Sequence, residues 1–183
     1  MKTLPLSRLD TADHLVTPQA FSDIDEHSPA LSLMTDFRQH WPHAVSVSAP
    51  ALEVARQMKA EGVSGKLVID RQRELVGMLT LERLSEQSIL VALHRLGIDR
   101  SSLTAGDLMQ PRAAMPVVDY EAVASATVTD LVATLREAGE PYCLVRDAEH
   151  HIRGLFSVSE LSERLHRRLS VKPKASIIEV LKA

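Results

Sequence analysis

Residues 62–86 read GVSGKLVIDRQRELVGMLTLERLSE, and residues 139–163 read GEPYCLVRDAEHHIRGLFSVSELSE. The two stretches align without a gap at an offset of 77 residues. The identical pairs are Gly62/Gly139, Leu67/Leu144, Val68/Val145, Asp70/Asp147, Gly77/Gly154, Leu84/Leu161, Ser85/Ser162 and Glu86/Glu163. Chance rarely gives a match in which glycines, turn acids and apolar positions all agree, so the sequence indicates an internal duplication.

Each copy predicts the same order of strands and helices. Apolar residues recur at helical spacing, and β-branched runs with polar loops between them are typical of paired strands. The expected segments in the two copies are a short strand (44–48 and 122–126), a helix (51–58 and 128–135), a strand pair (66–70 with 75–80, and 143–147 with 152–157) and a closing helix. Each helical run ends at a glycine suited to a C-cap. The fold class is therefore α/β, with two β-α-β-β-α repeats related by pseudo-two-fold symmetry.

The two copies are expected to pack against each other. A unit of roughly 60 residues buries only about 60% of its unfolded surface and is marginal alone. The predicted division of the chain is an extended N-terminal arm (1–30), a first domain (31–96), a linker (97–103), a second domain (104–170) and a C-terminal tail (171–183).

Composition excludes several classes of protein. The net charge of −3 and the pI near 6.2 argue against a nucleic-acid-binding surface. The lone Cys143 allows no intrachain disulfide and no cysteine-rich zinc site. The most apolar segment, residues 88–93, is too short to span a bilayer. Near the N-terminus, Asp10 and Asp13 interrupt what would have to be the apolar stretch of a signal peptide. We expect a soluble, cytoplasmic protein without a membrane partner.

The repeated motifs resemble the cystathionine β-synthase (CBS) domain pair, or Bateman module, over residues 32–170. The motifs that carry the resemblance are VSGKLVID (63–70) with VGMLTLERL (76–84), PYCLVRD (141–147) with RGLFSVSEL (153–161), and the preceding segments SLMTD (32–36) and AGDLM (105–109). The resemblance implies two clefts between the domains, adenosine-containing ligands and disc-shaped dimers. Apolar helix faces also predict a homodimer: Leu84, Ile89, Leu90, Leu93, Leu161, Leu165 and Leu169.

The resemblance also implies roles for four residues. It assigns phosphate contacts to Thr80 and Ser157, and ribose contacts to Arg83 and Glu160. A carboxylate can accept from both hydroxyls of a ribose, whereas Arg83 can only donate. We therefore expect an altered site in copy two and the loss of the ribose site in copy one. Arg83 is left with two roles, a phosphate contact or, preferably, a surface ion pair with a neighbouring glutamate.

Other interpretations of copy two stay open. Residues 157–160 (SVSE) also match a capping box, which by itself explains both Ser157 and Glu160. The resemblance places the adenine near Tyr142 and Cys143. Tyr142 then stacks on the base or fills the core, and Cys143 is expected to be an inert core thiol.

The remaining chemistry-bearing residues predict no metal site and no enzyme. His40, His43, His150 and His151 lack ligand spacing, and a solvated-loop position is expected for them. Neither a phosphate-binding glycine loop nor a nucleophile elbow is present. The basic run from Arg164 to Lys174 is either a solvated helix end or a site that steers phosphates or docks a partner.

The sequence therefore favours a stand-alone regulatory module that senses an adenosine-containing ligand such as AMP, ADP or ATP. Such a module acts on an effector protein in trans, with no cofactor beyond that nucleotide ligand. The alternative is a structural dimer module whose clefts are degenerate and ligand-free.

Overall fold

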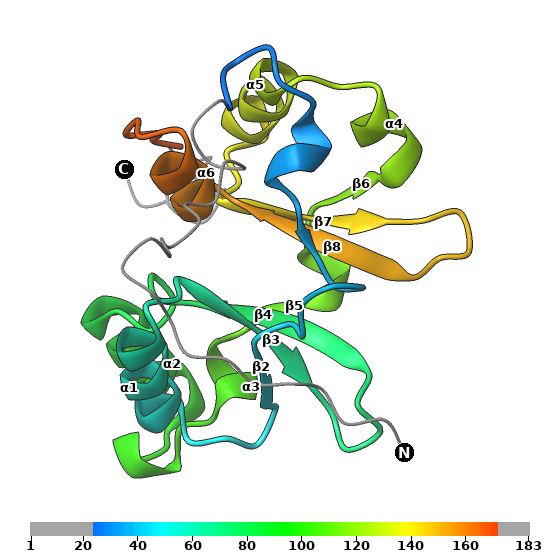
Figure 1. Cartoon of the computed structure of the whole chain (residues 1–183). Coiled ribbons are helices and arrows are strands. Elements are labelled where there is room, and N and C mark those ends of the chain that lie inside the picture. Colours follow the sequence, from blue (N-terminus) through cyan, green and yellow to red (C-terminus); the bar gives the residue numbers. More distant parts are fainter. Residues whose placement is uncertain (1–23, 172–183) are drawn as a thin grey trace, which may run out of the picture.

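The two copies fold into two similar α/β units, one above the other in Figure 1. The computed structural model describes residues 24–171. The first unit contains β2 (Ala44–Ser46), α1 (Ala51–Glu61), β3 (Gly65–Ile69), β4 (Leu75–Thr80) and α2 (Glu86–Leu96). The second contains β6 (Val117–Asp119), α4 (Tyr120–Ala124), α5 (Val128–Ala138), β7 (Tyr142–Arg146), β8 (Ile152–Ser157) and α6 (Val158–Arg164). The central helix and the strand pair keep the offset of 77 residues, so the predicted repeat fold is confirmed.

Alternation along the strands creates three apolar clusters. In β3, Val68 points toward the helices of its own unit, whereas Leu67 points toward the other unit. In β7, Val145 and Leu144 repeat this arrangement. Two cores therefore lie under the helices. A third cluster joins the two sheets, and its buried members are Leu67, Met78, Tyr142 and Leu144.

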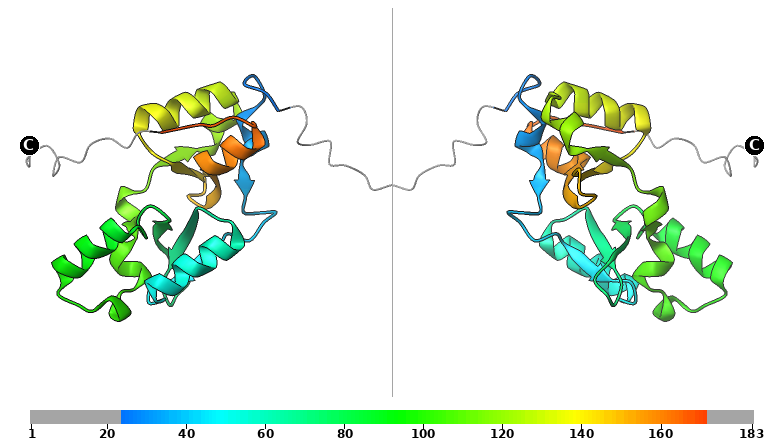
Figure 2. Two further views of the ribbon diagram at one scale, coloured as in Figure 1. Left: turned by 90° about the vertical axis from the view of Figure 1, so that its left-hand side faces the viewer. Right: turned by 90° about the vertical axis from the view of Figure 1, so that its right-hand side faces the viewer.

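Each sheet is completed by the segment that precedes the other copy. β1 (Thr35–Asp36) pairs with β8, and β5 (Gln110–Pro111) pairs with β4. The short helices beside them follow the same exchange. η2 (Ala30–Leu33) lies on α4 and α5, and α3 (Ala105–Leu108) lies on α1 and α2. Figure 2 shows the blue segment with β1 running along the second unit. The predicted domain boundaries did not include this exchange.

The glycines inside β4 and β8 make the exchange feasible. A Cβ atom at Gly77 would lie 2.5 Å from the carbonyl oxygen of Gln110, and one at Gly154 would lie 2.8 Å from that of Thr35. Any side chain at these positions would push the edge strand away.

Two predicted elements differ in the structure. The prediction of a strand at 122–126 is wrong. Residues 122–124 form the end of α4, residues 125–126 lie in the loop after it, and β6 takes the predicted place beside β7 in the sheet. More residues separate β6 from α5 than separate β2 from α1, and α4 takes up the extra length. The closing helix of the second copy is also shorter than its apolar residues at 161–169 predict. α6 ends at Arg164, although Leu165 and Leu169 still pack against the second core.

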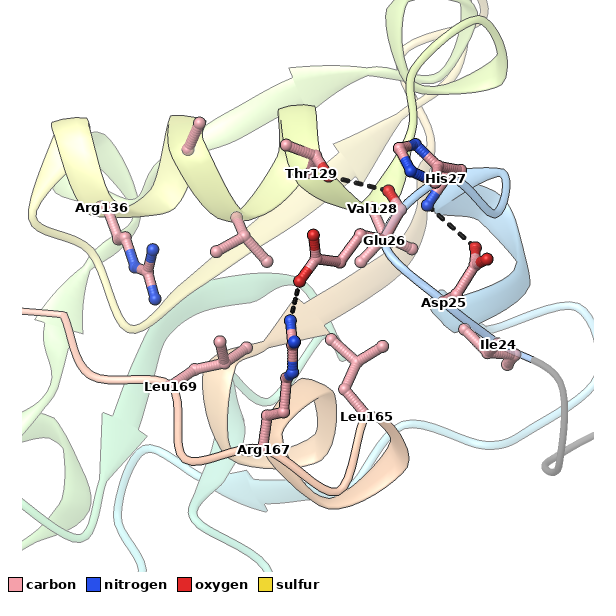
Figure 3. A pocket seen from close by; sticks show the side chains of 12 residues that line it. Ile24, Asp25, Glu26, His27, Val128, Thr129, Arg136, Leu165, Arg167 and Leu169 are labelled. Carbon is pink, nitrogen blue, oxygen red and sulfur yellow. Dashed lines mark hydrogen bonds and ion pairs between the residues drawn. The ribbon is translucent and has the colours of Figure 1, made fainter.

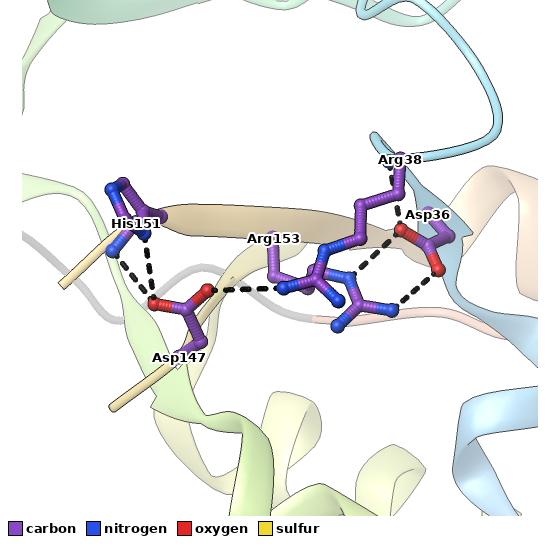
Figure 4. A network of polar contacts seen from close by, with 5 residues as sticks. All are labelled: Asp36, Arg38, Asp147, His151 and Arg153. Atoms are coloured by element: carbon purple, nitrogen blue, oxygen red, sulfur yellow. Dashed lines mark hydrogen bonds and ion pairs between the residues drawn. The ribbon is translucent and has the colours of Figure 1, made fainter. Parts of the chain in front are cut away.

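A polar network fixes β1 to the second unit (Figure 4). Arg153 donates to both carboxylate oxygens of Asp36, at 3.0 and 2.9 Å, and its guanidinium lies 4.9 Å from the centre of the Tyr120 ring. The hydrogen bond from Arg153 lowers the pKa of Asp36 below its usual value. Arg38 extends the network to Asp147 at 3.8 Å.

Candidate functional site

A cleft with a volume of about 530 Å³ opens between the two units. This volume lies within the range of small-molecule sites. Its lining comes from both units and from the β1–β2 connection: Thr35, Phe37, Gln39, His40, Trp41, Pro42, His43, Val63, Ser64, Gly65, Leu67, Met78, Leu155, Ser157, Glu160 and Arg164. We call it the open cleft.

The polar end of the open cleft is formed by β8 and α6. Ser157 ends β8, and Glu160 lies in the first turn of α6. One carboxylate oxygen of Glu160 accepts a hydrogen bond of 2.8 Å from the Thr35 hydroxyl. Arg164 lines the cleft one turn later. An acceptor and a cation therefore lie along the same wall.

The capping-box interpretation of residues 157–160 is wrong. Ser157 is the N-cap of α6, but its side chain caps no backbone N–H group. Its hydroxyl lies 2.6 Å from that of Ser159, which in turn lies 2.6 Å from that of Ser64. Because Glu160 bonds to Thr35 and not to the helix end, its carboxylate is part of the cleft wall.

The floor of the open cleft is apolar and depends on a glycine. Val63, Leu67, Met78 and Leu155 provide aliphatic and thioether surface. Gly65 lies among them, and a Cβ atom there would come within 2.5 Å of the Met78 methyl carbon. The absence of a side chain at position 65 therefore lets the Met78 side chain pack directly against β3 in the floor of the cleft.

At the equivalent place in the second copy, a tyrosine fills the space. Gly65 pairs with Thr80 across β3 and β4, and Tyr142 pairs with Ser157 across β7 and β8. The Tyr142 side chain is buried in the cluster between the sheets. Its hydroxyl donates to Gln110 at 2.9 Å, and burial raises its pKa well above the usual value. Tyr142 therefore fills the core, which was one of the two interpretations of this residue, and it does not line the open cleft.

The structure does not bring Thr80 and Arg83 into one cavity. Thr80 lines a cavity of about 400 Å³ that it shares with Pro141 and Ser157, whereas Arg83 lines a separate one beside α2 and α3. The expected surface ion pair of Arg83 is not formed within residues 24–171. Its guanidinium lies 3.5 Å from the carbonyl oxygen of Leu108, while Glu86 pairs with Arg100 at 2.7 Å.

Cys143 lies in the second core and not in the open cleft. Burial raises the pKa of its thiol to about 12, so the thiol is protonated at neutral pH. The side chain is 5% exposed and acts as a small apolar group.

The sequence motifs did not indicate that the β1–β2 connection forms part of a site. Residues 37–43 contribute much of the open cleft, including Phe37, Trp41 and both histidines that were expected to lie in a solvated loop. The signal available in the sequence was a tryptophan between two histidines in a segment without helical or strand periodicity. Thr35 was missed because its contact with Glu160 crosses 125 positions of the chain.

One group of potential metal ligands lies in the β7–β8 turn. Ligand atoms of Asp147, Glu149 and His151 lie within 4.8 Å of one another. The Asp147 carboxylate accepts from the backbone N–H of His151 at 2.9 Å, which lowers its pKa. Asp70 makes the same turn bond to Glu74 in the first copy, where no histidine is present. The hydrogen bond that closes the turn therefore explains why an aspartate stands at position 147.

A second cavity of about 600 Å³ lies on the outer face of the second unit (Figure 3). The segment around Glu26 forms one side, α5 another, and residues 165–169 the third. Glu26 forms an ion pair with Arg167 across it. The part of the predicted N-terminal arm from Ile24 onward thus lies against the second unit. Residues 1–23 and the tail from Lys172, with part of the basic run, lie outside the described residues.

Within residues 24–171, no helix has the length and apolar character needed to cross a bilayer.

Comparisons with known proteins agree with this architecture. Residues 42–89 match the family model described as CBS domain. Comparison with curated proteins gives no match.

Several solved structures share the fold. An uncharacterized conserved protein from Pyrococcus horikoshii aligns with a TM-score of 0.55 at 20% identity, over 81% of this chain and 99% of that chain. CBSX2, solved in complex with AMP, aligns with a TM-score of 0.54 at 24% identity, over 75% of this chain and 94% of that chain. The CBS-domain containing protein ATU1752 from Agrobacterium tumefaciens has a TM-score of 0.55 at 12% identity, over 82% and 98% of the two chains. Residues 42–89 therefore resemble a CBS domain, and the two units together share the fold of solved CBS-domain proteins.

Proposed function

We propose that this protein is a regulatory module that binds one adenosine-containing ligand, such as AMP, ADP or ATP, in the open cleft. In this proposal it has no enzymatic activity and acts in the cytoplasm on an effector protein in trans. Ligand binding between the two units changes how they pack against each other, and the effector protein responds to this change.

The observation that carries the proposal is the shared position of Ser157 and Glu160. Both line one cleft, and neither is used to cap α6. An ionised carboxylate takes two hydroxyl donors, which a ribose provides at adjacent carbons. The Thr35 hydroxyl already donates to Glu160, so the carboxylate is held in place for a ligand.

The rest of the cleft suits the other parts of a nucleotide. Arg164 supplies a cation for phosphate, and the apolar floor around Gly65 supplies a surface for the base. The fold shared with CBSX2, which holds AMP, supports the same ligand class. Glu160 has one methylene more than the aspartate that the family resemblance implies, and the volume of the cleft leaves room for it.

The proposal assigns one ligand to each chain. The position equivalent to Gly65 holds Tyr142, and the position equivalent to Glu160 holds Arg83. The first change fills space, and the second removes the acceptor for a ribose. Thr80 keeps a hydroxyl but lies in a different cavity from Arg83.

A homodimer is part of the proposal. Leu84, just before α2, and Ile89 on α2 are buried in the first core, whereas Leu90 and Val91 on the outer side of α2 are 56 and 62% exposed. A second copy with the same helix face would cover these side chains. Light scattering should give a mass of about twice 20.2 kDa, and a mass that stays at 20.2 kDa at all concentrations would remove this part.

The same apolar face favours the second candidate, a structural dimer module without a ligand. The two are separated by a melting screen with AMP, ADP, ATP, NAD and S-adenosylmethionine. A ligand present at 100 times its Kd should stabilise the protein by about 2.7 kcal/mol. Calorimetry with the most stabilising nucleotide should give one site per chain. If none of the five raises the melting temperature, the structural role is favoured.

A further inference from the structure

Trp41 occupies an unusual position at the mouth of the open cleft. It is the single tryptophan of the chain, and its side chain is 88% exposed. A tryptophan can bury 150–250 Å² of surface, so such exposure leaves a large apolar area in water. Phe37 and Pro42 line the same cleft, so the exposed ring belongs to a group of apolar side chains.

The segment that carries Trp41 crosses from one unit to the other. It leaves β1 in the sheet of the second unit and enters β2 in the sheet of the first. The backbone N–H of Phe37 donates to the carbonyl oxygen of Arg153 at 2.9 Å, and the carbonyl oxygen of His43 accepts from the backbone N–H of Leu67 at 2.8 Å. His43 is also held by Glu61, at 3.2 Å. Both ends are therefore fixed, and Trp41 lies on the span between them.

The floor of the open cleft offers an apolar surface to a flat group. Gly65 has no side chain, and the apolar floor continues into Leu67 and Met78. Two polar groups of the cleft, Ser157 and Glu160, come from the second unit. A ligand with a planar apolar end and a hydroxylated end matches this division between the two sides.

We propose that Trp41 stacks on the base of the bound ligand and holds it against the wall formed around Gly65. The inference rests on the proposed function and adds to it the residue that recognises the base. Stacking of a base on an aromatic side chain tolerates different bases, because every base has a π-face. Trp41 thus selects for ligands that contain a base, and Glu160 selects for the ribose.

The test uses the full chain, with AMP as the probe. Removing a stacking side chain lowers affinity about 5- to 150-fold. We expect Trp41→Ala to weaken AMP binding by a factor in this range in calorimetry, and Trp41→Phe to retain most of the affinity. Since the side chain is exposed, both variants should melt at the wild-type temperature in the absence of ligand.

Tryptophan emission gives an independent readout, because Trp41 is the only tryptophan. AMP should change the emission of the wild type in step with binding, and ribose 5-phosphate, which has no base, should leave it unchanged. If wild-type protein binds AMP and Trp41→Ala binds it equally well, this inference is overturned and the proposed function stands. If the wild type binds no adenosine ligand, both are overturned.

Discussion

The two copies present nearly the same backbone to each other, yet the two equivalent places between them differ. At the open cleft, Gly65 has no side chain and contacts Met78, and Thr35 donates to Glu160. At the equivalent place, Tyr142 fills the space, and its hydroxyl donates to Gln110. Thr35 and Gln110 occupy matching positions on the two exchanged edge strands, since they pair with Leu155 and Met78.

This comparison shows how a duplicated fold separates two tasks. The central helices α1 and α5 and the strand pairs keep their offset, so each unit is stabilised by the same packing of helix on sheet. The cleft positions have diverged in size and in hydrogen-bonding chemistry, and one site has become part of the core. A ligand in the open cleft would then contact both units, but at only one of the two equivalent places.

The largest effect is expected from removing the side chain that fills the second place. Tyr142→Ala deletes a buried ring and should lower the free energy of unfolding by about 3–5 kcal/mol. Denaturant unfolding measures the change. Tyr142→Phe keeps the ring and loses one hydrogen bond, and should cost only about 0.5–1.5 kcal/mol. Equal stabilities for wild type and Tyr142→Ala would show that the ring does not fill a core position.

The converse substitution should close the open cleft. Gly65→Tyr places a ring where the second copy has one, and the first atom it meets is the flexible end of Met78. The protein should therefore fold, while AMP affinity should fall by about 100-fold or more, a loss of about 2.7 kcal/mol. Calorimetry gives the affinity, and circular dichroism with a melting curve confirms folding. A folded Gly65→Tyr protein that binds AMP normally would contradict the location of the site.

Replacing the acceptor should weaken binding without filling the cleft. A lost charge-assisted hydrogen bond is worth about 1.5–3 kcal/mol, roughly 10- to 150-fold in affinity, so Glu160→Ala should reduce AMP binding by that factor. Arg83→Ala is the matched control at the equivalent position and should change affinity little. Because Glu160 does not cap α6, its removal should lower the melting temperature only slightly, through loss of the hydrogen bond from Thr35. A large drop in stability with unchanged affinity would reverse the assignment.

The repeat fold could be predicted from the sequence because its signals are local. The glycines at 62 and 139 end α1 and α5, and the second strand of each pair has the predicted bounds. The offset failed ahead of α5, where α4 is an insertion that no repeat predicts, and at the closing helices, since α2 begins at Glu86 and α6 at Val158. Pairing of residues 35–36 with β8 could not be predicted, because a two-residue strand has no periodicity.

The open cleft was only partly predictable for a related reason. Ser157 and Glu160 stand in a motif and were found there, whereas Thr35 and Trp41 belong to the cleft through contacts between distant segments. Gly65 and Tyr142 are aligned at the offset of 77, but what each does depends on which groups face it across the sheets. The capping box was a sound interpretation of four residues, and a partner 125 positions away replaced it.

The smallest expected effect concerns the exchanged edge strands, which also differ between the copies. Asp36 on β1 is paired with Arg153, whereas the matching positions on β5 and β4 are Pro111 and Val76. Asp36→Asn keeps the shape of the side chain and removes its charge. We expect it to lower the free energy of unfolding by about 1 kcal/mol at pH 7.

The pH dependence of this variant provides the sharper measurement. Since Arg153 lowers the pKa of Asp36 in the folded state, the carboxylate contributes its stability fully above the unfolded value of about 3.9. The contribution is lost as the pH falls through the lower folded value. The difference in unfolding free energy between wild type and Asp36→Asn should therefore be constant from pH 7 to about 5 and shrink below about 4. A difference that stays constant into acid would mean that Asp36 stabilises β1 through its shape and not through its charge.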